Sequence, residues 1–230
     1  MSLVLVTGSS GQVGRAVAAS LETAGRSVRR FDLVDGDDLR DAAAVRAATR
    51  GCDAIVHAGA IAHDRAGTPD DIVATNVLGT WHVLSGAEQH GVGRIVVFSS
   101  AQVFGFAEGE GEPVSLPVDD DHPLLASRPY GMSKRLVEQM CDAWTTRTRI
   151  TTIVLRPVMI LDDEALGHVS EDQAELGAFV HLDDVAAAVE LALAAGIEGH
   201  VRMTLCGPGR FDTARARRLL GWQPSRSWTR

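Results

Sequence analysis

Aromatic residues make up only 5% of the sequence, which contains one tyrosine, Tyr130, and one lysine, Lys134. If the two residues were placed independently, a spacing of four would occur in roughly one chain in a hundred or two. A helix places residues four positions apart on one face, where an ammonium can lower the pKa of a phenol from about 10. The pair is therefore a candidate acid/base couple. The alternative is an ordinary helix start with a solvated lysine, because the Y-x-x-x-K pattern alone is weak.

Other features that the sequence lacks narrow the class of protein. The three cysteines, Cys52, Cys141 and Cys206, contain no C-x-x-C pair, so we expect reduced, buried thiols in a cytoplasmic protein. No apolar run reaches membrane-spanning length, and the apolar start at 1–6 is too short for a signal sequence. The net charge is -8 and the arginines are scattered, which argues against nucleic acid or an anionic membrane as the main partner.

The 230 residues, of which 45% are apolar, suffice for one domain with a full α/β core. Short β-rich apolar runs alternate with longer helical patterns, and this alternation predicts a Rossmann-like, doubly wound parallel sheet. The expected strands lie at 3–6, 27–31, 53–57, 94–98, 150–155 and 201–205. The expected helices include 41–50, 69–89, 129–146, 185–195 and 213–220, and the stretch 106–128 is expected to form a loop over the site.

A glycine-rich turn directly follows the first expected strand. In the segment 7–14, Gly8 permits a tight turn, Gly11 allows the backbone to approach a pyrophosphate, and Gly14 allows the next helix to pack closely on the strand. The N-terminus of that helix offers free N–H groups and a positive dipole to an anion. Strand, turn and helix in this order favour a phosphate-binding loop over a ligand-free Gly/Ser turn.

Asp32 stands at the end of the second expected strand, where a carboxylate can accept both ribose hydroxyls of NAD. Leu33 follows it rather than an arginine, so a 2′-phosphate would be repelled and NAD is favoured over NADP. The alternative is a surface acid in a turn.

Three further polar residues occupy suggestive places. Ser100 follows the strand at 94–98, and a hydroxyl at the carboxyl end of a strand faces the crevice where α/β sheets bind ligands. A serine that merely ends a strand is the common alternative. His57 on its own is more often structural than catalytic. Asn76 lies within a helical pattern that it fits poorly, so a structural or water-binding role is plausible.

Motifs along nearly the whole chain occur in the order of one known family. They are T-G-S-S-G-Q-V-G at 7–14, D-L-R-D at 38–41, H-A-G-A at 57–60, T-N-V-L-G-T at 75–80, S-S-A-Q-V-F-G at 99–105, P-Y-G-M-S-K at 129–134, L-R-P at 155–157, F-V-H-L-D-D-V-A at 179–186 and L-G-W-Q-P at 220–224. With Asp32, these motifs resemble the extended short-chain dehydrogenase/reductases, the NAD-dependent epimerase/dehydratase family.

The resemblance implies an NAD-dependent oxidoreductase that transfers hydride at a hydroxyl or carbonyl carbon of a sugar or nucleotide-sugar. In it, Tyr130 would exchange a proton with the substrate, Ser100 would hydrogen-bond the same oxygen, and Lys134 would lower the tyrosine pKa and hold the nicotinamide ribose. The NAD contacts that it implies are Gly8, Ser10, Gly11, Gln12, Val13, Gly14, Asp32, Asp38, Leu39, His57, Ala58, Gly59, Asn76, Tyr130 and Lys134, with no metal.

The sequence departs from the family pattern in two places that bear on the substrate. Only about twenty residues separate Pro157 from Phe179, where family members usually carry substrate-binding elements. We therefore expect an NAD-binding Rossmann domain at 1–157 and a small, non-independent substrate-binding region at 158–230. A compact sugar, sugar acid or lactone then competes with a nucleotide-sugar. The pair Ala101-Gln102 stands where dehydratases carry Asp-Glu, so dehydration is disfavoured.

The remaining expectations concern partners and the main alternative function. The resemblance implies a homodimer in which the helices matching 70–89 and 130–146 pair with their copies. We expect the second helix to expose several apolar side chains, because it carries more of them than one buried face requires. These candidates are Leu136, Val137, Met140 and Trp144. The alternative to an enzyme is a non-catalytic, NAD(P)-sensing regulatory protein with a Rossmann fold, but such a sensor has no use for a tuned phenol.

Overall fold

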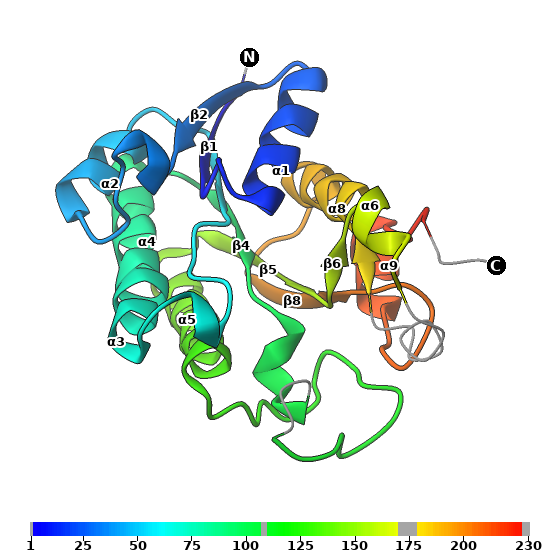
Figure 1. Cartoon of the computed structure of the whole chain (residues 1–230). Helices are drawn as coiled ribbons and strands as arrows, with labels where there is room; N and C mark the ends of the chain where they lie inside the picture. Colours follow the sequence, from blue (N-terminus) through cyan, green and yellow to red (C-terminus); the bar gives the residue numbers. More distant parts are fainter. Residues whose placement is uncertain (1, 107–109, 170–178, 227–230) are drawn as a thin grey trace.

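In the computed structural model, which describes residues 2–106, 110–169 and 179–226, six parallel strands form the centre of the fold (Figure 1). Their order across the sheet is β2-β1-β3-β4-β5-β8. The order reverses at β1, which has β2 on one side and β3 on the other, so crossovers run in both directions and the sheet is doubly wound. The strands are β1 (Leu3–Thr7), β2 (Ser27–Phe31), β3 (Ala54–His57), β4 (Arg94–Phe98), β5 (Thr151–Pro157) and β8 (His200–Leu205).

The central strands are buried along almost their whole length, which explains their continuous apolar sequences. All four residues of β3 and all seven of β5 are buried. A parallel sheet is covered on both faces by its crossover helices, so its strands show apolar runs rather than alternation. The predicted fold class, a Rossmann-like doubly wound parallel sheet, is confirmed.

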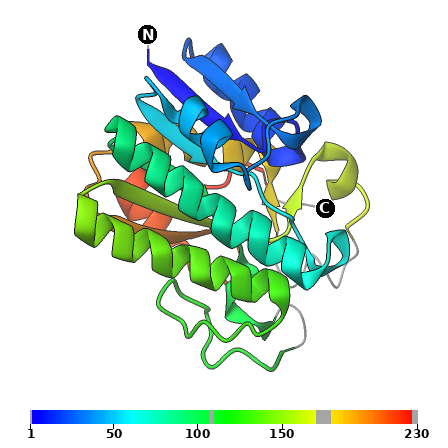
Figure 2. The ribbon, with the colours of Figure 1, turned by 90° about the vertical axis from the view of Figure 1, so that its left-hand side faces the viewer.

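Helices cover the two faces of the sheet in two groups. α1 (Gln12–Thr23) and α8 (Leu182–Ala194) pack against one face and against each other. α2 (Ala42–Thr49), α4 (Gly79–His90) and α5 (Pro129–Thr148) cover the other face, where Figure 2 shows α4 and α5 side by side. Two local predictions hold: the Asp41 carboxylate caps α2 by accepting from the N–H groups of Ala43 and Ala44, and Pro129 occupies the first turn of α5.

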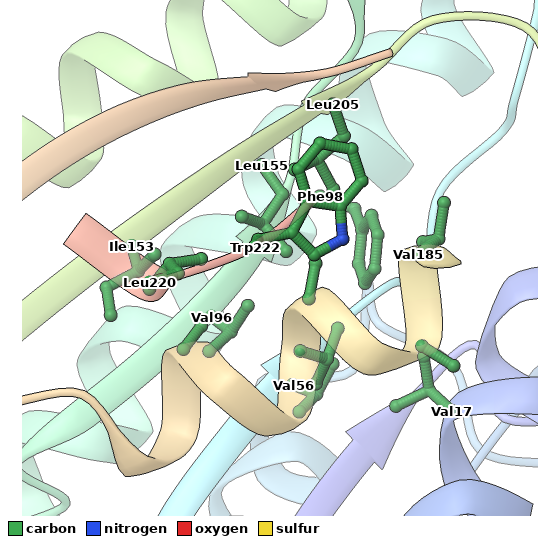
Figure 3. Close-up of a cluster of buried hydrophobic side chains, with 14 of the residues drawn as sticks. Val17, Val56, Val96, Phe98, Ile153, Leu155, Val185, Leu205, Leu220 and Trp222 are labelled. Atoms are coloured by element: carbon green, nitrogen blue, oxygen red, sulfur yellow. The ribbon is translucent and has the colours of Figure 1, made fainter. Parts of the chain in front are cut away.

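The C-terminal part of the chain belongs to the same core as the N-terminal part. Trp222 is 2% exposed and inserts among Phe98, Leu155 and Val185, as Figure 3 shows. Its indole Nε1 donates a hydrogen bond to the carbonyl of Asp184 at 2.8 Å. The region 158–230 thus supplies the strand β8, the helix α8 that covers one face of the sheet, and the side chain of Trp222 in the core.

The shorter elements connect this framework. They are η1 (Leu33–Asp35), η2 (Asp64–Ala66), α3 (Pro69–Ile72), η3 (Val73–Leu78), η4 (Ala101–Phe104), β6 (Ile160–Leu161), α6 (Asp163–Leu166), β7 (Val180–His181) and α9 (Ala214–Leu220). Residues 107–109 of the expected loop and 170–178 of the short segment lie outside the described residues. No helix in the described part of the chain combines the length and hydropathy that a membrane crossing requires.

The helix expected at 69–89 is interrupted. α3 leads into the π-helical turn η3, which contains Asn76, and α4 follows. A π-helical turn inserts an extra residue into the helix, and such turns occur frequently at functional sites. Asn76, a poor helix former, makes side-chain hydrogen bonds there that a regular helix would not require.

The prediction of exposed apolar side chains on α5 is wrong for Val137 and Trp144. Val137 is 1% exposed and Trp144 is 6% exposed, because both face the sheet and pack in its core. Helical periodicity alone left the buried face of this long helix undefined, and packing against β4 and β5 decides it. The large apolar side chains that are exposed on η3, α4 and α5 are Val73, Leu78, Trp81, Met132 and Leu136.

Candidate active site

A cavity of about 1290 Å³ lies along the carboxyl ends of the strands, beside the reversal point of the sheet. Segments that follow β1, β2, β3, β4 and β5 all contribute to its wall. Most of the residues singled out from the sequence line it. They are Gly8, Ser10, Gly11, Gln12, Val13, Gly14, Asp32, Asp38, Leu39, Ala58, Gly59, Ser100, Tyr130 and Lys134.

The glycine turn is packed so closely that side chains are excluded from it. Gly8 has φ 68°, and a Cβ there would lie 2.6 Å from the backbone nitrogen and Cα of Gly59. A Cβ on Gly14 would lie 2.0 Å from the carbonyl oxygen of Gly8. Gly11 is the N-cap residue of α1 and has no side chain to cap the helix, so the first N–H groups of this helix remain available at the cavity wall. The turn therefore presents bare backbone and a helix N-terminus, as an anionic ligand requires.

Two carboxylates lie at the end of the cavity beside β2. Asp32 accepts hydrogen bonds from the N–H groups of Ser10 at 2.9 Å and Val34 at 3.0 Å, which fixes its side chain next to the glycine turn. Asp38 forms an ion pair with Arg40, with Nη2 and Oδ2 2.6 Å apart. The Arg40 guanidinium holds the pKa of Asp38 below its usual range. This end of the cavity is therefore acidic, as the assignment of Asp32 to ribose hydroxyls requires.

Tyr130 and Lys134 lie on the first two turns of α5, and both are buried against the cavity. The Lys134 Nζ lies 5.8 Å from the centroid of the Tyr130 ring and donates a hydrogen bond to the carbonyl of Phe98 at 2.9 Å. Burial lowers the pKa of Lys134 to about 8, although the Glu138 carboxylate opposes this shift. The N–H of Tyr130 donates to Asp64 at 2.7 Å, which ties the start of the helix to η2. The i, i+4 spacing thus brings ammonium and phenol together, as predicted.

Ser100 follows the carboxyl end of β4 and begins η4. Its hydroxyl oxygen accepts a hydrogen bond from the N–H of Gln102 at 3.1 Å, so the side chain is oriented by the turn that it caps. Ser100, Tyr130 and Lys134 all line the same cavity. The three side chains that the sequence singled out as a catalytic set therefore lie on the wall of one cavity.

His57 and Asn76 do not lie on the described cavity wall. His57 is hydrogen-bonded between the hydroxyls of Thr7 at 2.7 Å and Thr80 at 2.9 Å, and burial lowers its pKa to about 3. Asn76 makes two hydrogen bonds with the backbone of Ile61 and donates to Ser133 at 3.0 Å. The polar side-chain atoms of both residues are hydrogen-bonded to other parts of the protein. In this arrangement both residues stabilise the segments that form the cavity wall and do not face a ligand in the cavity.

Sequence reasoning missed a buried ionic network behind Ser100. Arg156 and Glu138 form a bidentate ion pair with Nε–Oε1 and Nη2–Oε2 distances of 2.8 and 2.6 Å, and both side chains are fully buried. Ser99 donates to the same carboxylate at 2.6 Å, and Arg156 also donates to the carbonyl of Asp120. Arg156 stands in the L-R-P motif, but nothing local in that motif identifies its partners. The network joins β5, α5, the end of β4 and the loop before α5.

An aromatic cluster at the far end of the cavity was also missed. Phe104, Phe106 and Phe211 have ring centroids 6.0 to 6.3 Å apart, and Phe106 and Phe211 line the cavity. Val118 pairs with Phe211 in an isolated bridge that joins the loop to the segment after β8. Three of the six phenylalanines in the sequence therefore gather at one place. The loop and the segment after β8 are far apart in the sequence, so no local sequence pattern predicts that they pair.

The fold and the glycine-lined cavity define a Rossmann-type dinucleotide-binding protein. Residues 4–161 match the model of the family described as "NAD dependent epimerase/dehydratase family". The chain belongs to this family.

Curated relatives include enzymes named for sugar substrates and a 2-alkyl-3-oxoalkanoate reductase of Stenotrophomonas maltophilia, which is 33% identical over 173 residues, covering 68% of this chain and 50% of the relative. A uronate dehydrogenase of Pseudomonas syringae pv. tomato is 29% identical over 165 residues, which cover 66% of this chain and 58% of the relative. A UDP-glucose 4-epimerase of Oryza sativa subsp. japonica is 30% identical over 199 residues, covering 74% of this chain and 47% of the relative. The chain therefore spans about half to three fifths of these relatives' lengths.

Solved structures resemble the chain over its whole length. A short-chain dehydrogenase/reductase superfamily protein of Agrobacterium tumefaciens, solved with bound NAD, has a TM-score of 0.84 at 26% identity, covering 99% of this chain and 93% of the other. The similarity thus extends past residue 161 into the C-terminal region.

Proposed function

We propose that this chain is an NAD-dependent oxidoreductase that transfers hydride at a hydroxyl or carbonyl carbon of a compact sugar-type substrate. The observation that carries the proposal is the placement of Ser100, Tyr130 and Lys134 on the wall of the same cavity as the glycine turn. A dinucleotide and a proton-transferring side chain can then meet in one site.

The residues present fit NAD. The turn at Gly8 and Gly14 has no room for side chains, and the uncapped N-terminus of α1 offers N–H groups to a pyrophosphate. Leu39 packs against Gly59, where a Cβ would lie 2.8 Å from the leucine Cδ1, and gives an apolar wall for an adenine. Asp32 would accept the ribose hydroxyls and would repel a 2′-phosphate. NAD supplies the hydride acceptor or donor when it is bound.

The chain's own residues would then manage the proton. Tyr130 would take the proton of a substrate hydroxyl, or return it, with Ser100 hydrogen-bonded to the same oxygen. The Lys134 ammonium would stabilise the phenolate that forms when Tyr130 gives up its proton. The hydrogen bond from Lys134 to the carbonyl of Phe98 fixes the ammonium group, so its charge would stay near the phenol. A non-catalytic sensor would gain nothing from burying this pair, which disfavours that alternative.

Substitution of the tyrosine tests the proposal. Tyr130→Phe keeps the ring and removes the proton, so turnover should fall on the order of a hundredfold or more while NADH affinity changes little. Lys134→Arg should lose both rate and affinity, because the guanidinium fork cannot replace a compact ammonium. The substrate needed for these rates would first be identified by a screen of aldoses, uronic acids and nucleotide-sugars. The screen measures NADH absorbance and the stereochemistry of the products. A wild-type activity that survives in Tyr130→Phe would refute the assignment.

The short segment between β6 and β7 favours a net dehydrogenase of a compact substrate over an epimerase of a nucleotide-sugar. The behaviour of the cofactor separates the two, because an epimerase regenerates and keeps its NAD whereas a dehydrogenase releases NADH. Purified protein that carries stoichiometric NAD and changes the stereochemistry of a sugar without net NADH formation would establish the epimerase instead.

We also propose a homodimer formed through the outer surfaces of η3, α4 and α5. A groove there is lined by Asp70 and by six apolar residues, of which Trp81 is half exposed. The apolar residues are Val73, Ala74, Val77, Leu78, Trp81 and Met140. Such an apolar groove is costly in water, and a second copy of the same surface would cover it. A monomer in light scattering at micromolar concentration would refute the dimer.

We also propose a reducing, cytoplasmic setting for the protein. All three cysteines are buried, which supports this proposal.

A further inference from the structure

Charge is distributed unevenly along the described cavity wall. Four carboxylates line it, and all of them lie in the half formed by the segments after β2 and β3: Asp32, Asp37, Asp38 and Asp71. The half that lies beyond β4, where Tyr130 stands, has no carboxylate among its described lining residues. A carboxylate on the substrate would be repelled by the four carboxylates of the first half and tolerated in the second.

Arg210 is the basic side chain available in that second half. Lys134 is buried and donates a hydrogen bond to the carbonyl of Phe98. Arg40 lies in the acidic half of the cavity and forms an ion pair with Asp38. Arg210 is exposed on the cavity wall and makes no side-chain hydrogen bond or ion pair within the described residues. Within the described part of the chain, its guanidinium therefore has no carboxylate partner.

The backbone of Arg210 is fixed although its side chain is not engaged. The N–H of Val118 donates to the carbonyl of Arg210 at 2.8 Å, and the N–H of Asp212 donates back to Val118 at 2.8 Å. Apolar residues of the cavity wall lie near this position: Phe211 is its neighbour in the chain, and the ring centroids of Phe106 and Phe211 are 6.0 Å apart. A guanidinium beside apolar walls binds an oxyanion more strongly than one in open water, and its planar fork suits a carboxylate.

We propose that the substrate carries a carboxylate, that Arg210 binds it, and that the aromatic wall at Phe106 and Phe211 packs on the body of the substrate. This rests on the proposed function, because the hydroxyl or carbonyl that reacts must lie at Tyr130 in the same cavity. The ligand class is a compact hydroxy or oxo acid. Two sources share this chemistry: a sugar acid, whose C–H faces stack on aromatic rings, and an apolar hydroxy acid.

The test measures binding first and hydride transfer separately. Calorimetric titration of the NAD-loaded protein compares D-glucuronate with D-glucose, and 3-hydroxyhexanoate with its methyl ester. Each acid has a neutral partner, so the carboxylate is the variable. The variants are Arg210→Gln and, as a matched control, Arg218→Gln, which removes the same charge from an exposed site on α9 away from the described cavity wall.

We expect at least one acid to bind tenfold or more tightly than its neutral partner in the wild type and in Arg218→Gln. Arg210→Gln should weaken that acid by about 10- to 100-fold and leave the neutral compound unchanged. Preference for glucuronate identifies a sugar acid, and preference for the hydroxyhexanoate identifies an apolar acid. Equal binding of acid and neutral partner, equal loss of both in Arg210→Gln, or no binding of either acid at 10 mM would overturn the proposal.

NADH formation, followed in parallel, separates this inference from the proposed function. Oxidation of a neutral compound as readily as its acid would support the oxidoreductase and overturn the carboxylate subsite. Binding of an acid that depends on Arg210 without any NADH formation would support the subsite and count against the oxidoreductase. Melting curves of Arg210→Gln establish that the variant is folded.

Discussion

Replacing Glu138 with glutamine should lower the melting temperature by roughly 6 to 20 °C. In the wild type the carboxylate accepts two hydrogen bonds from Arg156 and one from Ser99, and both members of the ion pair are fully buried. Glutamine keeps the size of the side chain but removes its charge, so the Arg156 guanidinium stays buried without the carboxylate that pairs with it. Breaking a buried pair in this way costs about 3 to 5 kcal/mol.

The conversion to temperature uses the size of the chain. For a chain near 230 residues, about 1 kcal/mol shifts the melting temperature by about 2 to 4 °C. The matched control is Glu88→Gln, since Glu88 forms the same kind of bidentate pair with Arg147 at 2.8 and 2.5 Å, but on the surface. An exposed pair contributes about 1 kcal/mol or less, so the control should shift the melting temperature by a few degrees at most.

A double variant tests the cause of the loss. Glu138→Leu with Arg156→Met replaces both charges by apolar groups of similar size, and replacement of a whole buried pair is often neutral. It should therefore melt above Glu138→Gln. Calorimetry or circular dichroism gives the melting temperatures. Indistinguishable melting temperatures for Glu138→Gln and Glu88→Gln would refute the reasoning, because burial would then have no energetic consequence for the pair.

Three other predictions follow from the site and the surface. Asp32→Ala should narrow the preference for NAD over NADP by tenfold or more in fluorescence titrations, and tighter NADP binding by the wild type would contradict the assignment of Asp32. If the proposed dimer forms, Trp81→Glu should shift it toward monomer in light scattering at micromolar concentration, because two carboxylates would be buried in the interface. An unchanged mass would show that Trp81 does not lie in the interface. Burial lowers the pKa of Lys134 to about 8 from 10.5, so between these values the unfolded chain binds more protons than the folded one. Stability should therefore rise with pH in this range relative to Lys134→Met, and a pH-independent difference in melting temperature would contradict the buried ammonium.

The sequence by itself determined the local structure of this protein. The strands at 27–31 and 94–98 were predicted with the bounds that the structure has, because continuous β-rich runs between turns leave little choice of conformation. The glycine turn and the pair Tyr130 and Lys134 could also be read in advance. A glycine's freedom at positive φ and the i, i+4 geometry of a helix depend on neighbours within a few residues.

The tertiary structure decided which side chains face the cavity, the core or one another. His57 and Asn76 belong to motifs beside the cavity, but neither side chain faces it. His57 is hydrogen-bonded to Thr7, 50 residues away, and Asn76 is hydrogen-bonded to Ser133, 57 residues away. Trp144 faces the sheet. Arg210 lies on the cavity wall, where its backbone pairs with Val118, 92 residues earlier in the chain.

These placements depend on contacts between segments that are far apart in sequence. A side chain's burial and partners are set by what packs opposite it, and the pattern within its own segment carries no record of that neighbour. Backbone conformation is decided within a few residues, whereas the chemistry of a site is decided by the strand order that brings distant segments together at one edge of the sheet.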